Sequence, residues 1–127
     1  MAESEGTPPE EQKEPRGVFN PNVVDLVSYD AERDEVVLLM LEERAWDTDP
    51  EQLRQLEAKF NSYLSYVLDG HLSQQYPDYA DKDVCFRLDC AAAPRGEAEK
   101  MLRAMQNFAA GEQIRFVVQR IEDPVQA

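Results

Sequence analysis

The sequence contains few of the residues from which metal and cofactor sites are commonly built. Its single histidine and two cysteines cannot supply the four ligands of a structural zinc site, and it has no C-x-x-C pair. Its five glycines are too scattered to form a phosphate-binding loop or a G-x-G-x-x-G dinucleotide motif. We therefore expect no metal ion and no cofactor.

Basic residues are also scarce. Lysine and arginine number 13 against 26 acidic residues, which gives a formal net charge of −13. Nucleic acids and anionic membrane surfaces both bind basic protein surfaces, so the composition predicts neither as a partner. No apolar run approaches the roughly 18 residues that span a bilayer, and the acidic N-terminus does not resemble a signal peptide. With two cysteines interpreted as reduced thiols, we expect a cytoplasmic protein.

One folded domain is expected between two tails. Residues 1–21 lack hydrophobic periodicity and contain four prolines and five glutamates, a composition typical of a flexible tail. Residues 122–127 resemble this segment. The folded domain is therefore predicted at residues 22–121, a length at which one hydrophobic core is common.

Hydrophobic patterns predict the element order ββαβαβ. Two apolar runs separated by a polar turn indicate a hairpin. A long segment with apolar residues at spacings of three and four indicates an amphipathic helix. Its N-cap is Thr48 or Asp49. The helix either continues to residue 75 or is ended or bent at Gly70. Met105 and Phe108 belong to the predicted inner stripe of a second helix. The predicted strands are 23–28, 35–42, 83–89 and 113–121, and the helices are 50–75 and 98–109.

The order of the elements predicts their arrangement in space. Crossovers between parallel strands are right-handed, so the last three strands should be parallel and both helices should lie on one face of the sheet. The predicted fold is an α/β two-layer sandwich whose four-stranded mixed sheet has the order 1-2-3-4. No helix would cover the opposite face, and a homodimer or the folded-back N-terminal tail would shelter it. The predicted interface residues there are Val37, Leu39, Leu41, Val117 and Ile121.

The carboxyl ends of the strands are the expected position of a ligand site in an open α/β sheet. Capping of helix ends and ion pairing on a solvated rim would explain the polar residues at this edge without a ligand. A divalent cation bound by Glu42, Asp47 and Asp89 is a third interpretation. Trp46 is expected to close the end of the core or, as the alternative, to anchor a partner. The candidate ligand-binding residues are Glu42, Arg44, Trp46, Asp47, Asp89, Cys90 and Arg120.

The predicted geometry argues against a catalytic pair of His71 and Cys90. The first helix runs back along the sheet, so its 21 residues from Pro50 place His71 about 32 Å from the carboxyl edge where Cys90 lies. A nucleophile and its base must be within hydrogen-bond reach, and no catalytic residue is therefore predicted. Near the end of the same helix, Tyr66, Tyr76 and Tyr79 are candidates for an aromatic patch.

Short motifs follow one another along the folded part of the chain. They are V-D-L at 24–26, E-x-R-x-W-D at 42–47, N-x-Y-L at 61–64 with L-D-G at 68–70, Q-Y-P at 75–77, L-D-C at 88–90 and I-R-F-V-V at 114–118. In this order they resemble a family of small bacterial proteins known only as a domain of unknown function. The likeness covers about residues 22–121. It implies a bacterial source and a single compact domain, and it carries no assigned activity.

The lack of a catalytic constellation and the uncovered sheet face together predict a non-enzymatic protein-interaction module. It would be a homodimer through the open sheet face. An acidic antagonist of the immunity type, which caps a basic partner protein, is an alternative and would form a salt-dependent complex. A second alternative is a small-ligand or enzyme site at the carboxyl edge of the sheet, which would require a concave pocket there.

Overall fold

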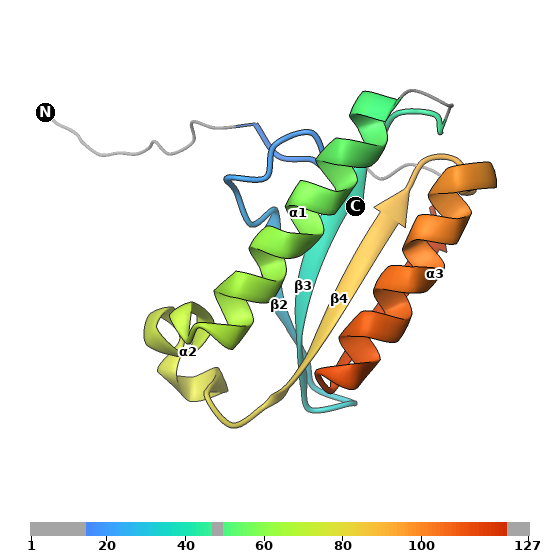
Figure 1. Ribbon diagram of the computed structural model, residues 1–127. Helices are drawn as coiled ribbons and strands as arrows, with labels where there is room; N and C mark the ends of the chain where they lie inside the picture. Colours follow the sequence, from blue (N-terminus) through green and yellow to red (C-terminus); the bar gives the residue numbers. More distant parts are fainter. Residues whose placement is uncertain (1–14, 47–49, 122–127) are drawn as a thin grey trace, which may run out of the picture.

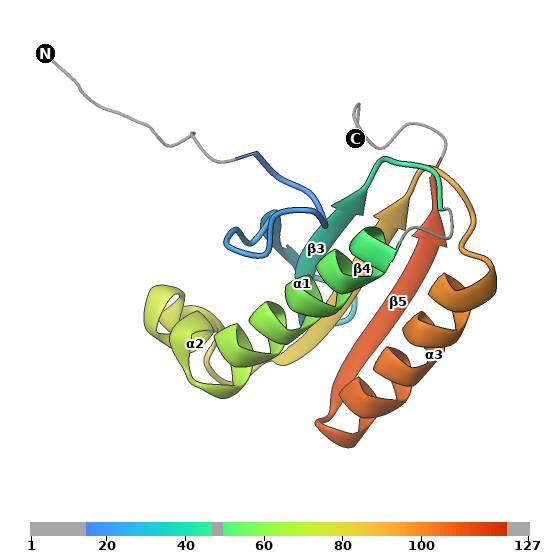
Figure 2. The same cartoon turned by 45° about the horizontal axis from the view of Figure 1, so that its top comes forward.

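The computed structural model describes residues 15–46 and 50–121. A four-stranded sheet forms one layer, and helices cover one of its faces (Figures 1 and 2). The strands lie in the order β2 (Leu26–Asp30), β3 (Glu35–Glu42), β4 (Asp83–Cys90) and β5 (Ile114–Arg120). β2 is antiparallel to β3, and the other two pairings are parallel. The predicted fold class, strand order and placement of the helices are confirmed.

The first predicted helix is divided by a glycine. α1 (Pro50–Leu68) is followed by the short α2 (His71–Gln75) and by the 3₁₀ turn η1 (Pro77–Tyr79). Gly70 between the two helices has φ 89°, a left-handed conformation that glycine adopts at little cost. The chain turns there, and α2 lies beside the end of α1 (Figure 1). The predicted N-caps of α1 lie outside the described residues.

The second covering helix, α3 (Gly96–Gly111), packs on the same face of the sheet as α1 (Figure 2). The inner faces of the helices and strands meet in one hydrophobic core, as the spacing of the apolar residues predicts. The prediction is wrong for Phe108, whose side chain is 55% exposed. It lies on the flank of the buried stripe of α3, and its ring meets Phe60 edge-on with the centroids 6.4 Å apart.

The segment before β2 belongs to the folded domain. Val18 is fully buried in the core, and its N–H donates to the carbonyl oxygen of Leu41 at 2.8 Å. Gly17 has φ 133°, and a Cβ built there would come within 2.9 Å of the Phe19 ring, so the position requires glycine. The predicted tail boundary is therefore wrong for residues 17–21, where the pair Val18-Phe19 was the available signal.

A fully buried ion pair between Asp25 and Lys59 fixes this segment against α1. The Lys59 Nζ lies 2.8 Å from Asp25 Oδ1 and also donates to the carbonyl oxygens of Asn20 and Val23 at 2.7 and 2.6 Å. All three ammonium protons thus have acceptors. Burial lowers the pKa of Lys59, and the Asp25 carboxylate opposes that shift. A buried charge is tolerated only with such complete hydrogen bonding.

The carboxylate of Asp25 completes the junction by accepting two backbone N–H groups. Oδ1 accepts from Gly17, and Oδ2 accepts from Leu41, both at 2.9 Å. The buried hydroxyl of Tyr63 accepts the N–H of Asp25 at 2.8 Å and donates to the Leu39 carbonyl at 2.6 Å. The Tyr63 side chain thus bridges Asp25 to β3, and β2 starts at Leu26 rather than at residue 23 as predicted.

We expect Asp25→Ala to lower the free energy of unfolding by about 3–5 kcal/mol, because it leaves the Lys59 ammonium buried without its counter-charge. Urea unfolding followed by circular dichroism measures this loss. Lys100→Ala, which breaks an exposed ion pair with Glu97, is the control and should leave the unfolding midpoint unchanged.

The double variant Asp25→Ala, Lys59→Met is expected to regain part of the lost stability, because an apolar side chain replaces the isolated charge. A double variant less stable than Asp25→Ala alone would contradict the assignment of the loss to an unpaired ammonium.

Candidate functional site

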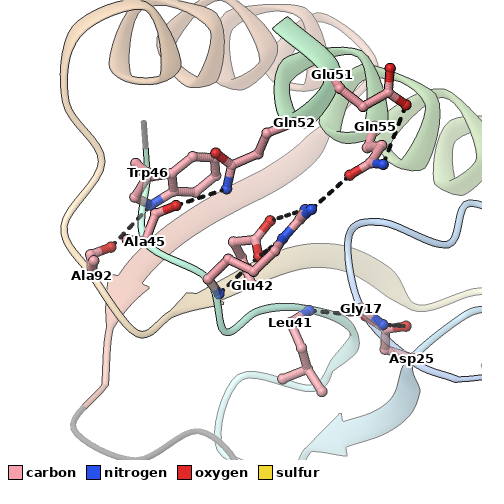
Figure 3. A network of polar contacts seen from close by, with 11 residues as sticks. Gly17, Asp25, Leu41, Glu42, Ala45, Trp46, Glu51, Gln52, Gln55 and Ala92 are labelled. Carbon is pink, nitrogen blue, oxygen red and sulfur yellow. Dashed lines mark hydrogen bonds and ion pairs between the residues drawn. The ribbon is translucent and has the colours of Figure 1, made fainter. Parts of the chain in front are cut away.

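An ion pair between Glu42 and Arg44 lies at the carboxyl end of β3. Glu42 is 2% exposed, and both its carboxylate oxygens accept from the Arg44 guanidinium, at 2.8 Å from Nε and 2.7 Å from Nη2. Arg44 also donates to the Gln55 side chain on α1 at 2.9 Å (Figure 3). Its guanidinium lies 6.0 Å from the centroid of the Phe19 ring. The two candidates therefore bind each other and tie the loop after β3 to α1.

Trp46 closes the end of the core. Its side chain is 3% exposed and belongs to the core cluster. The indole Nε1 donates to the Ala92 carbonyl at 3.0 Å, which joins the loop after β3 to the loop after β4 (Figure 3). The expectation of a lid is confirmed, and the alternative of an exposed anchor is wrong.

Cys90 is a buried thiol under this lid. Its pKa is raised to about 12, chiefly by burial; the hydrogen bond with Trp46 opposes this rise, and the negative charges of Glu42 and Asp89 add to it. Such a thiol stays protonated and is a poor nucleophile. His71 begins α2 at the opposite end of the strands (Figure 1), so the structure separates this pair, as predicted.

The remaining candidates do not join these residues in one cluster. Asp89 is 1% exposed and accepts from the Arg87 guanidinium at 3.1 and 3.2 Å on the outer side of the sheet. Arg120 is exposed at the end of β5, and Asp47 lies outside the described residues. In the ranges 15–46 and 50–121 no group of three or more His, Cys, Asp and Glu side chains could hold a metal ion. Internal partners thus bind Glu42, Arg44, Trp46 and Asp89 at this edge.

The outer face of the sheet carries the predicted interface residues, and none of the described helices covers it (Figure 2). Leu41, Val117 and Ile121 are half-buried there. Val37 and Leu39, on the central strand β3, are only 7% and 6% exposed. The exposed apolar surface is therefore a narrower stripe than the sequence suggested, lying toward the carboxyl ends of the strands.

An ion pair that the sequence did not reveal crosses this outer face. Arg115 on β5 reaches over β4 to Glu35 on β3, with Nη2 at 2.8 Å and Nε at 3.1 Å from the two carboxylate oxygens. The bond to Glu35 raises the pKa of Arg115 above its ordinary value. Cys85, the register partner of Arg115 on β4, is 2% exposed. The two residues are 80 positions apart in the sequence, so no local sequence pattern predicts this ion pair.

A groove of about 490 Å³ runs beside the free edge of β2. It adjoins a hollow of about 460 Å³, with which it shares Asn22, Val24 and Tyr66. Three large apolar or aromatic side chains at this side of the molecule are 40–44% exposed, namely Leu26, Tyr29 and Tyr76. The Tyr79 ring stacks on those of Tyr29 and Tyr76, with centroid distances of 5.7 and 5.6 Å. The predicted aromatic patch after α1 is therefore present, and it also contains Tyr29 of β2.

Comparison with known proteins identifies a family and no activity. The model of a family of unknown function, DUF6572, matches residues 17–122. No curated protein and no solved structure matches the chain. The match begins at Gly17, where the packed segment before β2 also begins. In the part of the chain that the structure describes, no helix combines the length and apolar character needed to cross a membrane.

The burial of the thiols has a measurable consequence. We expect a thiol-reactive disulfide reagent at pH 8 to leave Cys85 and Cys90 unmodified in the folded protein and to modify both after unfolding in urea. Absorbance of the released thiolate measures the reaction. Rapid modification of Cys90 in the folded protein would contradict its placement in the core.

The raised pKa also predicts a pH dependence. Folding raises the pKa of Cys90 from 9.0 to about 12, so the unfolded thiol loses its proton first as the pH rises. The free energy of unfolding should therefore fall between pH 9 and 12, and Cys90→Ala should reduce the slope measured by urea titration at several pH values. An unchanged slope would contradict this assignment.

Proposed function

The chain belongs to the DUF6572 family of unknown function, and we propose that it is a non-enzymatic protein-interaction module that forms a homodimer through the outer face of its sheet. The observation that carries the proposal is the placement of α1 and α3 on one face, opposite a stripe of half-buried apolar side chains. That stripe consists of Leu41, Val117 and Ile121 beside Leu39. The proposed setting is the bacterial cytoplasm, where buried thiols stay reduced.

The charges on the outer face suit contact with a second copy. The pairs Glu35–Arg115 and Asp89–Arg87 supply two positive and two negative groups that lie beside the apolar stripe. A two-fold axis brings the same surface patch of each copy together, so a patch with both signs of charge can complement itself. A patch with one sign of charge would repel its own copy.

The size of the face sets the expected strength of the dimer. Four strands at a spacing of about 4.8 Å and seven residues at about 3.3 Å give a face of roughly 19 by 23 Å. This area, on the order of 400 Å², is below the roughly 800 Å² per partner of a standard stable interface. We therefore expect a reversible dimer whose population depends on protein concentration.

We expect Val117→Asp to shift the protein to the monomer, because the carboxylate would be desolvated in the proposed interface. Light scattering coupled to size-exclusion chromatography at tens of micromolar distinguishes the 14.5 kDa chain from a particle of twice that mass. Leu68→Asp is the matched control, since Leu68 is 51% exposed on α1, on the helical side. A wild-type protein that stays monomeric at this concentration contradicts the proposal.

A further inference from the structure

The most exposed large apolar side chains of the described residues lie on the helical side of the molecule. Phe108 of α3 is 55% exposed, and Leu68 of α1 is 51% exposed. The two helices run in the same direction across one face of the sheet (Figures 1 and 2). Exposed apolar side chains mark an interaction site when they form a patch rather than stand singly.

A hollow of about 210 Å³ between α1 and α3 joins these side chains into such a patch. Its deepest lining residues are Phe60 and Met105, which are 4% and 6% exposed, and Phe108 lies at its edge. Helical spacing places Leu68 on the same side of α1 as Asn61, seven residues earlier. We call this surface the α1–α3 groove. Besides Glu57, the residues that line its hollow are Phe60, Asn61, Met101, Ala104, Met105 and Phe108.

Glu57 gives the groove a negative charge that nothing in the fold balances. Every other charged side chain of α1 and α3 belongs to an ion pair. The pairs are Glu51–Arg54, Asp25–Lys59, Glu97–Lys100 and Glu99–Arg103. Among the described residues, Glu57 has no ion pair and no hydrogen-bond partner, and its side chain is exposed at the hollow. A lysine or arginine of a partner would complement this carboxylate.

The walls of the groove favour a helical partner over an extended one. Both walls are helices, whose N–H groups bond to carbonyl groups four residues earlier, so neither wall offers an edge to an added strand. A helix needs no such edge, since its own backbone groups are already bonded. Side-chain ridges of a helix also pack into grooves on a helical surface. Met101 and Met105 add flexible side chains that adapt to an incoming apolar group.

We propose that the α1–α3 groove binds an amphipathic helix of a partner protein. This helix places an apolar side chain in the hollow and a lysine or arginine beside Glu57. The ends of the chain itself lack this composition, because residues 1–14 contain five glutamates, one lysine and two prolines, and residues 122–127 contain two acids and no base. A second copy fits poorly, since every lysine and arginine of the described helices is already in an ion pair.

The test uses the full-length protein and a displayed library of peptides of roughly 16 residues, about four helical turns. Apolar residues stand at spacings of three and four, and the other positions are random. Enriched peptides are labelled with a fluorophore, and fluorescence polarisation measures their affinity. We expect lysine or arginine beside the apolar stripe. Phe108→Ala should weaken binding about tenfold or more. Tyr76→Ala, at a side chain 40% exposed beside β2, is the control and should leave binding unchanged.

A charge reversal tests the role assigned to Glu57. Glu57→Lys should weaken binding of the enriched peptides about tenfold or more. Glu32→Lys makes the same change in net charge at an exposed position of the β2–β3 turn and should leave the affinity unchanged. A peptide whose basic residue is replaced by glutamate should bind Glu57→Lys more tightly than it binds the wild-type protein.

A proline in the centre of the peptide tests the helical conformation. It should abolish binding because it breaks the helix, and circular dichroism of the complex with the unmodified peptide should show added helix. A selection without enrichment, full binding by the proline peptide, or equal binding by Glu57→Lys and Glu32→Lys would overturn the proposal. A self-association that Phe108→Ala disrupts would assign the groove to a second copy and would also overturn it.

The outcome is independent of the proposed dimer. Val117→Asp on the outer face should keep the peptide affinity of the wild-type protein, whatever its effect on assembly. Leu68→Asp should keep the assembly state and weaken peptide binding. Loss of peptide binding in Val117→Asp with an unchanged fold, or unchanged binding in Leu68→Asp, would contradict the assignment of the partner to the α1–α3 groove.

Discussion

The buried ion pair between Lys59 and Asp25 is the contact on which the arrangement of the other parts depends. Removing two charges from water costs several kcal/mol per ion, and only close geometry and complete hydrogen bonding offset that cost. Here one ammonium has three acceptors, and one carboxylate accepts it together with two backbone N–H groups. The pair thereby sets where β2 starts and where the preceding segment crosses α1. It also fixes a segment that lines the groove beside β2.

Much of the fold follows from rules that operate over short stretches of sequence. The valines and leucines of 35–42 form β3 with the predicted bounds, and crossover handedness gives the strand order. The errors lie where long-range contacts override local pattern. Lys59 interrupts the apolar stripe of α1, which was a signal of a buried partner, but nothing local identifies Asp25 34 residues earlier. The start of β2 and the limit of the N-terminal tail both depend on that pair.

The candidate residues at the carboxyl edge could be placed from the sequence, but their partners could not. Strand ends determine that Glu42, Trp46 and Cys90 lie near one another, and they do. Whether such residues bind a ligand depends on side-chain directions and on loops that meet only in the folded chain. The indole of Trp46 bonds to Ala92, 46 residues away, and Glu42 bonds to Arg44. The groove beside β2 was not predicted because its lining residues come from three separate segments.

The position of Trp46 makes its intrinsic fluorescence a probe of one end of the molecule. The chain has a single indole, and it lies almost fully enclosed where the loops after β3 and β4 meet. Its emission therefore reports on one end of the molecule without interference from other tryptophans. Loosening of those loops would admit water to the ring and move the emission to longer wavelength, while events at α2 would leave the signal unaltered.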